Sequence, residues 1–202
     1  MPGSMFNFEG KFKAFIDDIE FYNWTKEPAN GDAFANGMGT ELIGNRDFED
    51  VEIIVPEDTL PDADDLDSEN VGLTLATGTG YDNSGAVYGI TDFNAYTGEK
   101  SLYVDSTSGK IGLGSCADDI GMVKGTAYGM KFSIFVFYYS SGMLQIRPQN
   151  SQNQTYRAMY YTEISGTSKD GLTLTGTCAN RWTVTEGTGE QAGWYTFESI
   201  YP

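Results

Sequence analysis

A row of aromatic side chains beside an amide and a guanidinium is the feature of this sequence best suited to binding a ligand. The stretch 130–147 is rich in β-branched and aromatic residues, which predicts β-strand. We expect Ser140-Ser141-Gly142 to close it into a hairpin, with Gly142 supplying the left-handed conformation of a three-residue loop. This register pairs Tyr139 with Met143, Phe137 with Gln145 and Phe135 with Arg147.

The two faces of the predicted hairpin differ in chemistry, because side chains alternate between the faces of a strand. One face is apolar and points into a core; it carries Met130, Phe132, Ile134, Val136, Tyr138, Leu144 and Ile146. The other face carries the predicted ligand-binding residues Phe135, Phe137, Tyr139, Gln145 and Arg147.

These side chains suit a sugar. A pyranose has an apolar C–H face and a rim of hydroxyls, so aromatic rings stack on it while Gln and Arg fix its orientation. The alternative is that a loop or a second layer covers this face, which would make Phe135 and Phe137 additional core.

Two tryptophans extend the candidate site. Trp24 follows the first strand and Trp182 opens a later one, at element ends where exposed stacking platforms are common. We therefore predict that both contact the ligand. Binding at loop tips would favour the curved chain of starch, whereas a flat aromatic row would favour a linear β-glucan or xylan.

The composition indicates a β-protein with a neutral ligand. The 202 residues suffice for a sizeable core, and 14% aromatic residues with 25 glycines disfavour disorder. A net charge of −17 repels nucleic acids and anionic membranes, so we expect neither as a partner. We also expect no membrane insertion, because the sequence has no apolar run of 18 residues.

The reactive residue types are sparse. The chain has no histidine, which removes histidine-based triads and most zinc sites. Cys116 and Cys178 lack the spacing of a metal site and form either one disulfide or two buried thiols.

Short β segments separated by Gly-rich turns predict an all-β fold. We expect strands at 71–76, 86–91, 100–104, 110–113, 124–139, 143–147, 156–164, 171–174, 182–185 and 194–201. Residues 1–5 resemble an expression-tag remnant. Residues 6–202 are expected to form a single β-sandwich domain, with 6–24 as an edge strand, 25–44 as a loop and 45–202 as the main body.

Four segments resemble strands of the jelly-roll carbohydrate-binding modules of secreted bacterial polysaccharide-degrading systems. Residues 45–50 (NRDFED) are similar to an opening N-x-x-F-E-D/G strand, and 94–104 (NAYTGEKSLYV) to A-x-S-G-K-x-S-L-x-V. Residues 124–132 (KGTAYGMKF) are similar to x-G-x-x-Y-x-x-S-F, and 193–197 (GWYTF) to the late W-x-x-F strand. At that last position the resemblance implies that Trp194 lies in the core.

The resemblance implies a jelly-roll β-sandwich of two antiparallel sheets that binds polysaccharide without catalysis. Such a module attaches a secreted enzyme or a cell surface to plant polysaccharide, either starch and other α-glucans or β-glucan and xylan. It implies an extracellular or cell-surface location and a monomeric domain of a larger multi-modular protein.

One motif stands at an unexpected position. Such modules end in a strand like F-x-I-D-D-I-x-F, and here that pattern lies at the front, in residues 15–21. The domain is therefore either circularly permuted, with its last strand supplied by the N-terminal segment, or preceded by the tail of another module. The resemblance also implies a structural calcium ion, held by Asp18 and Glu49 with backbone carbonyls near Lys100.

Two other functions compete with this one. A jelly-roll glycoside hydrolase needs two facing carboxylates, for which Glu163 and Glu198 are the candidates. A structural or adhesin sandwich would bind no sugar at all.

Overall fold

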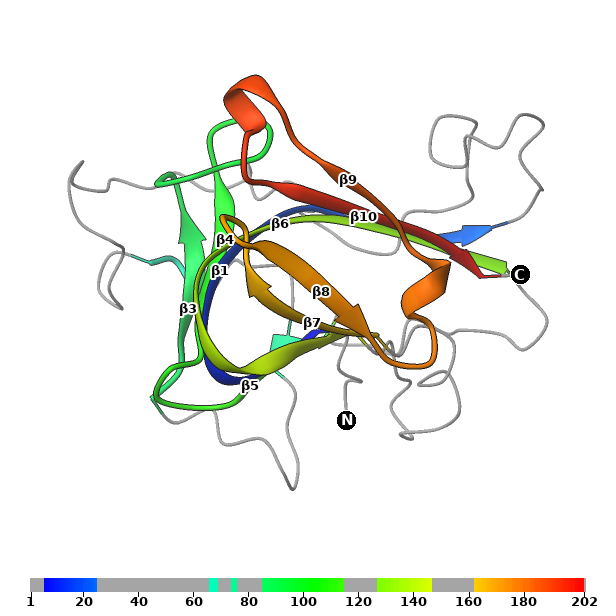
Figure 1. Ribbon diagram of the computed structural model, residues 1–202. Coiled ribbons are helices and arrows are strands. Elements are labelled where there is room, and N and C mark those ends of the chain that lie inside the picture. Colours follow the sequence, from blue (N-terminus) through cyan, green and yellow to red (C-terminus); the bar gives the residue numbers. More distant parts are fainter. Residues whose placement is uncertain are drawn as a thin grey trace.

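The computed structural model describes residues 6–24, 66–68, 74–75, 85–114, 127–146 and 162–201. These residues form ten antiparallel strands and two 3-10 turns, η2 (Ala179–Arg181) and η3 (Gly189–Gln191), with no α-helix among them (Figure 1). The all-β prediction is therefore confirmed. No helix of the described part is long and apolar enough to cross a membrane.

The strands belong to one hydrogen-bonded sheet with the main order β2-β5-β1-β6-β10-β9. Beside this path, β3 pairs with β4, which pairs with β1, and β8 pairs with β7, which pairs with β6. The bounds are β1 Phe6–Trp24, β2 Thr74–Leu75, β3 Val87–Thr91, β4 Ser101–Asp105, β5 Ile111–Gly114, β6 Ala127–Ile146, β7 Thr162–Thr167, β8 Gly171–Thr175, β9 Thr183–Glu186 and β10 Tyr195–Tyr201.

β1 lies in the interior of the sheet and not at an edge, contrary to prediction. One side of β1 pairs with β6 from Phe6 to Trp24, and its other side pairs with β5 and then with β4. Both faces of β1 are buried, with Phe12, Ala14 and Ile16 on one and Phe15 and Asp17 on the other, as suits an interior strand.

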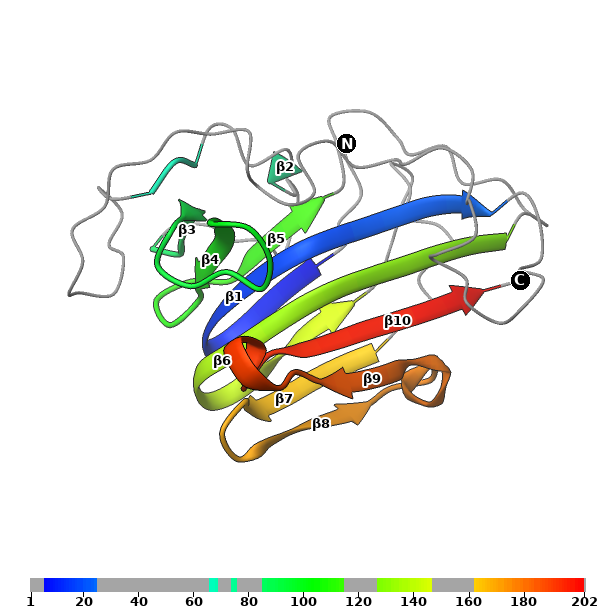
Figure 2. The same ribbon diagram turned by 90° about the horizontal axis from the view of Figure 1, so that it is seen from above.

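β1 and β6 bend together where Gly10 faces Gly142. These residues have φ values of +89° and +93°, and a Cβ on Gly142 would lie 1.8 Å from the carbonyl oxygen of Glu9. Only glycine tolerates this conformation and this approach. Figure 2 shows β1 and β6 curving side by side.

Ring contacts confirm how far the sheet bends. Phe6 is the cross-strand partner of Ile146, and its ring centroid lies 5.2 Å from that of Phe132. A straight strand would separate Phe132 from Ile146 by about 46 Å, at about 3.3 Å per residue. The two ends of β6 therefore face each other across the core.

The predicted hairpin turn at Ser140-Ser141-Gly142 is wrong. β6 runs through these residues as one strand of 20 residues, and its partner there is β1. Two long strands that bend together bury the same apolar residues as a hairpin would, which explains why the hydrophobic pattern misled the prediction. The predicted pairs within the hairpin, such as Phe137 with Gln145, are consequently wrong as well.

A β-bulge changes the faces predicted for the tyrosines. Lys13 pairs with Tyr138 and Ala14 with Val136, so Phe137 is the additional residue on β6. After this bulge Tyr139 packs against the core, and Tyr138 is 41% exposed. Their predicted positions are thus reversed.

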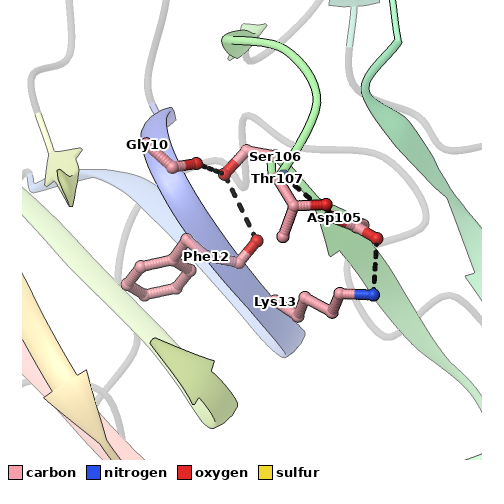
Figure 3. Close-up of polar contacts among 6 residues, drawn as sticks. All are labelled: Gly10, Phe12, Lys13, Asp105, Ser106 and Thr107. Atoms are coloured by element: carbon pink, nitrogen blue, oxygen red, sulfur yellow. Dashed lines mark hydrogen bonds and ion pairs between the residues drawn. The ribbon is translucent and has the colours of Figure 1, made fainter. Parts of the chain in front are cut away.

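Two serines bind backbone groups at the bends. The Ser106 hydroxyl donates to the carbonyls of Gly10 and Phe12, at 2.9 and 3.2 Å (Figure 3). Ser168, which follows β7, binds Val136 on the long strand β6. Its hydroxyl accepts the Val136 N–H and its own N–H donates to the Val136 carbonyl, both at 2.8 Å. A bend interrupts the hydrogen bonds between neighbouring strands, and the bonds from Ser106 and Ser168 pair backbone groups that would otherwise be left without a partner.

The core fills the inner side of the bend. Its fully buried aromatic residues include Phe6, Phe8, Phe12, Phe132 and Phe197. The Phe132 and Phe197 rings stack with centroids 5.1 Å apart. Phe8 and Phe12 lie on either side of Gly10, yet their centroids are only 5.8 Å apart, so this face is the concave one.

Candidate functional site

The convex face carries a second aromatic cluster, which we call the outer cluster. In the sheet register Phe15 pairs with Tyr103 on one side and with Phe135 on the other. Phe15, Tyr103 and Trp194 are buried at its centre, with Leu66, Val87, Tyr96, Phe135 and Phe137 packed around them.

Phe93 and Phe137 adjoin the buried centre of the outer cluster, and we call these two rings the platform. Phe93, in the loop after β3, stacks on Phe15 with an interplanar angle of 10° and is 42% exposed. Phe137 is half-buried and lies at 33° to Phe15 and at 19° to Tyr103. Phe93 and Phe137 thus both lie against the buried Phe15 ring, with centroids 5.8 and 5.6 Å from it.

The bulge places more groups beside this platform. Tyr138 pairs with Lys13, which precedes Phe15 by two residues on the same face of β1. The Lys13 Nζ lies 2.8 Å from Asp105 Oδ2, and Thr107 donates its N–H and hydroxyl to Asp105 Oδ1 (Figure 3). Ammonium and carboxylate thus stand next to exposed aromatic surface.

The Lys13–Asp105 pair is held in place by its neighbours. Burial alone would raise the pKa of Asp105, but the hydrogen bonds from Lys13 and Thr107 outweigh it and lower that pKa below its ordinary value. Asp105 is therefore ionised at neutral pH, and it fixes the ammonium group on the outer face.

The other end of the outer cluster is covered. Trp194 lies against both Phe135 and Tyr96, with ring centroids 5.8 and 5.7 Å apart. Gly193 approaches the Phe135 ring so closely that a Cβ there would lie 2.7 Å from it. The face is therefore covered at Phe135, as in the alternative raised from the sequence, whereas Phe137 remains partly exposed. The predicted burial of Trp194 is confirmed.

Asp17 fastens the loop that carries Phe93. This buried carboxylate accepts the N–H groups of Tyr96 at 2.8 Å, Thr97 at 3.1 Å and Asp18 at 2.8 Å. Burial, and then the charge of Asp18, raise the pKa of Asp17 to about 8, although the three N–H donors lower it. The platform loop is thus tied to the central strand.

The calcium prediction falls partly outside the described residues. Asp18 accepts the Thr97 hydroxyl at 2.9 Å, while Glu49 is not among the described residues. Asp17 faces N–H donors, which a cation would repel. The described part holds no group of three or more Asp, Glu, His or Cys side chains placed for a metal. Those residues alone do not fit calcium, which takes six to eight oxygens, and the Asp18–Glu49 site stays a prediction.

Three other predicted ligand contacts, Trp182, Tyr139 and Gln145, lie in the main core or beyond the bend. Trp182 is buried in the main core, where its Nε1 donates to the Thr162 hydroxyl at 2.8 Å, so it is no exposed ring. The Tyr139 hydroxyl donates to the Gly142 carbonyl at 3.1 Å. Gln145 pairs with Asn7 and Glu163, beyond the bend. Arg147 and the side chain of Trp24 lie outside the described residues.

The two candidate carboxylates of a hydrolase, Glu163 and Glu198, alternate with the buried residues Ile164 and Phe197, so both point away from the main core. Glu163 lies on β7, beside the end of β6 at Gln145, whereas Glu198 lies on β10, opposite Lys131. Cys178 is buried, and Cys116 is outside the described part, so their pairing stays open.

Sequence reasoning missed Phe93, Lys13 and Asp105. Phe93 is a large apolar residue between turn residues, which is a signal for an exposed ring. Lys13 and Asp105 are 92 positions apart, and only the pairing of β1 with β4 brings them together.

We compared the chain with known protein families, curated proteins and solved structures, and none of them matches it. Its function is therefore inferred from the site itself.

Proposed function

We propose that this domain is a non-catalytic carbohydrate-binding module and that its ligand lies on the platform of the outer cluster. One observation carries the proposal: of the three exposed large apolar side chains in the described part, Phe93 and Tyr138 both border this cluster. Exposed rings that border a buried aromatic floor and an ion pair suit a pyranose, with its apolar face and polar rim.

Charge favours a neutral ligand. The chain carries a net charge of −17, so an anionic polymer is repelled. Lys13 and Asp105 together offer both hydrogen-bond donors and acceptors to hydroxyl groups. A few stacked rings, each contributing about 0.5–1.5 kcal/mol, and a few hydrogen bonds support a Kd between about 1 mM and about 1 µM.

The wider context of the proposal comes from the resemblance of the sequence to jelly-roll modules. In this view the bent sheet is one form of a jelly-roll sandwich, with its two halves facing across the core. The domain is extracellular, belongs to a larger protein and holds an enzyme or a cell on plant polysaccharide.

Affinity electrophoresis tests the binding function. The wild type should be retarded in gels that contain a neutral polysaccharide, including at about 0.5 M salt, since no charge pairing drives binding. Phe93→Ala should reduce the retardation at least several-fold. Val184→Ala removes the third exposed apolar side chain, on β9, and should leave retardation unchanged.

The opposite result identifies the competing function. If no plant polysaccharide retards the wild type, the outer cluster is a second core and the domain is structural. Release of reducing sugar from soluble polysaccharide would instead indicate a glycoside hydrolase.

A further inference from the structure

We infer that the outer edge of β9 binds an extended, basic peptide segment of a partner protein as an additional antiparallel strand. In this kind of recognition, backbone hydrogen bonds supply the affinity and alternate side chains supply the specificity. The inference goes beyond the proposed function and does not depend on it, because no residue of β9 belongs to the outer cluster.

β9 is a terminal strand that carries none of the usual protection of a sheet edge. In the described part it pairs only with β10, whereas Asp67 exchanges two backbone hydrogen bonds with Ile90 beside β3. β8 also ends the sheet, but its residues Leu172 and Leu174 pack against the main core. All four residues of β9 are exposed, including Val184 at 37%. Its sequence, TVTE, contains no lysine or proline, the residues that commonly keep a free edge from pairing.

The direction of the backbone groups shows what this edge offers. The Gly187 N–H donates to the Trp194 carbonyl at 2.8 Å, so the backbone groups of Gly187 point toward β10. This direction alternates along an antiparallel strand, and Thr185 therefore also faces β10. The N–H and C=O groups of Val184 and Glu186 consequently point to the free edge. An added antiparallel strand can exchange two hydrogen bonds with each of these two residues.

The side chains of β9 specify the composition of the added strand. Val184 pairs with the buried Phe197, so its side chain lies on the core side of the sheet, and the side chain of Glu186 lies on the same side. The added strand would place an apolar residue opposite Val184 and a basic one opposite Glu186. Between them, a β-branched residue such as threonine suits the position opposite Thr185.

Charge favours a basic partner over a second copy of this chain. Glu186 and Glu190 lie at the end of β9, and Arg181 precedes its start. An antiparallel strand begins beside the two glutamates, so basic residues at its beginning meet opposite charge. The net charge of −17 attracts such a segment and makes two copies of the chain repel each other.

NMR titration of the isotope-labelled whole chain tests the inference. The probe is the acetylated and amidated peptide Lys-Thr-Lys-Thr-Val-Thr-Val, and its control has glutamate in place of both lysines. We expect the backbone amide signals of Val184 and Glu186 to shift most. The lysine peptide should bind at least about ten-fold more tightly than the glutamate peptide at about 50 mM salt, and this difference should shrink at about 0.5 M.

Two variants separate the backbone from the side chain. Val184→Pro removes an N–H that points to the free edge and should weaken binding at least about ten-fold, while Val184→Ala keeps this donor and should retain the preference for lysine. The lysine peptide N-methylated at both valines makes the same test on the wild type, and should bind as weakly, even if Val184→Pro does not fold. Phe93→Ala should bind the peptide like the wild type.

Three results would overturn the inference. The first is no shift of the Val184 and Glu186 signals at several mM lysine peptide, and the second is equal binding of the lysine and glutamate peptides at low salt. The third is a shift of the same signals when the chain alone is concentrated, which would identify a second copy as the occupant of the edge.

Discussion

Phe132 and Phe135 lie three residues apart on β6, on opposite faces of the same sheet. Phe132 is fully buried among Phe6, Trp182 and Phe197 in the concave core. Phe135 lies in the outer cluster, where a short loop segment covers one end and Phe93 remains exposed at the other. Both faces are rich in aromatic rings, but among the described residues only the convex face leaves ring surface and an ion pair beside solvent. Aromatic content alone therefore does not identify a binding face. The distinguishing feature is that some of the rings on the face remain exposed to solvent.

The bend that creates the two faces should be the most sensitive point. Gly142→Ala forces a Cβ against Glu9 at a positive φ, and we expect a loss of more than about 4 kcal/mol in unfolding free energy. Gly171 is the matched control, because it has φ +92° and no atom within 4 Å of the position that a Cβ would take. Gly171→Ala should lose only about 1–2 kcal/mol. Equal losses in urea titrations would show that the close approach at the bend is unimportant.

Removal of one ring from each face should separate stability from binding. Phe132→Ala leaves a cavity in the core and should cost about 3–5 kcal/mol, measured by urea unfolding. Phe93→Ala removes an exposed ring and should cost less than about 1 kcal/mol. A large loss of stability in Phe93→Ala would mean that its ring serves the fold and not a ligand.

The stability of the outer loop should depend on pH through Asp17. Its pKa is raised to about 8 in the folded state, so the folded protein binds the proton more tightly than the unfolded chain does. Stability should therefore fall as pH rises from about 4 to about 8, by at most about 1.4 kcal/mol per pH unit. The chain has no histidine to add a titration in this range.

Asp17→Asn is the matched variant, since an amide oxygen can still accept from the loop N–H groups. Its melting temperature should be nearly independent of pH between about 5 and about 8, the range in which only the wild type still titrates at this position. An unchanged pH profile in this variant would show that another group is responsible.

Trp182→Phe should affect stability and leave binding intact. The variant keeps an aromatic ring in the core but loses the hydrogen bond to Thr162, at a cost of about 1–2 kcal/mol. Its retardation in polysaccharide gels should equal that of the wild type. Reduced retardation at unchanged stability would restore the prediction that Trp182 contacts the ligand.

Calcium should have the smallest effect. If Asp18 and Glu49 share an ion, calcium should raise the melting temperature by a few degrees and EDTA should reverse this. Asp18→Asn should remove the response. No response in the wild type would exclude the predicted site.

Local patterns were enough to predict the strands but not their partners. The expected segments at 86–91, 100–104, 171–174 and 194–201 coincide with β3, β4, β8 and β10 to within one residue. The edge position of 6–24 and the hairpin at Gly142 were wrong, because alternation specifies which side chains are buried but not which strand lies alongside. The same limit applies to the site. Phe135 and Phe137 were correctly placed opposite the core, whereas one bulge reversed Tyr138 and Tyr139, and bulges have no periodic signature.

The double variant Phe93→Ala/Tyr138→Ala tests the central claim most directly. It removes both exposed rings that the described part carries on the convex face and changes no residue of the main core. We predict an unfolding midpoint in urea close to that of the wild type, together with loss of retardation in a gel that contains the β-glucan or xylan the wild type binds. A folded double variant that is retarded as strongly as the wild type would contradict the claim that the outer cluster is the binding site.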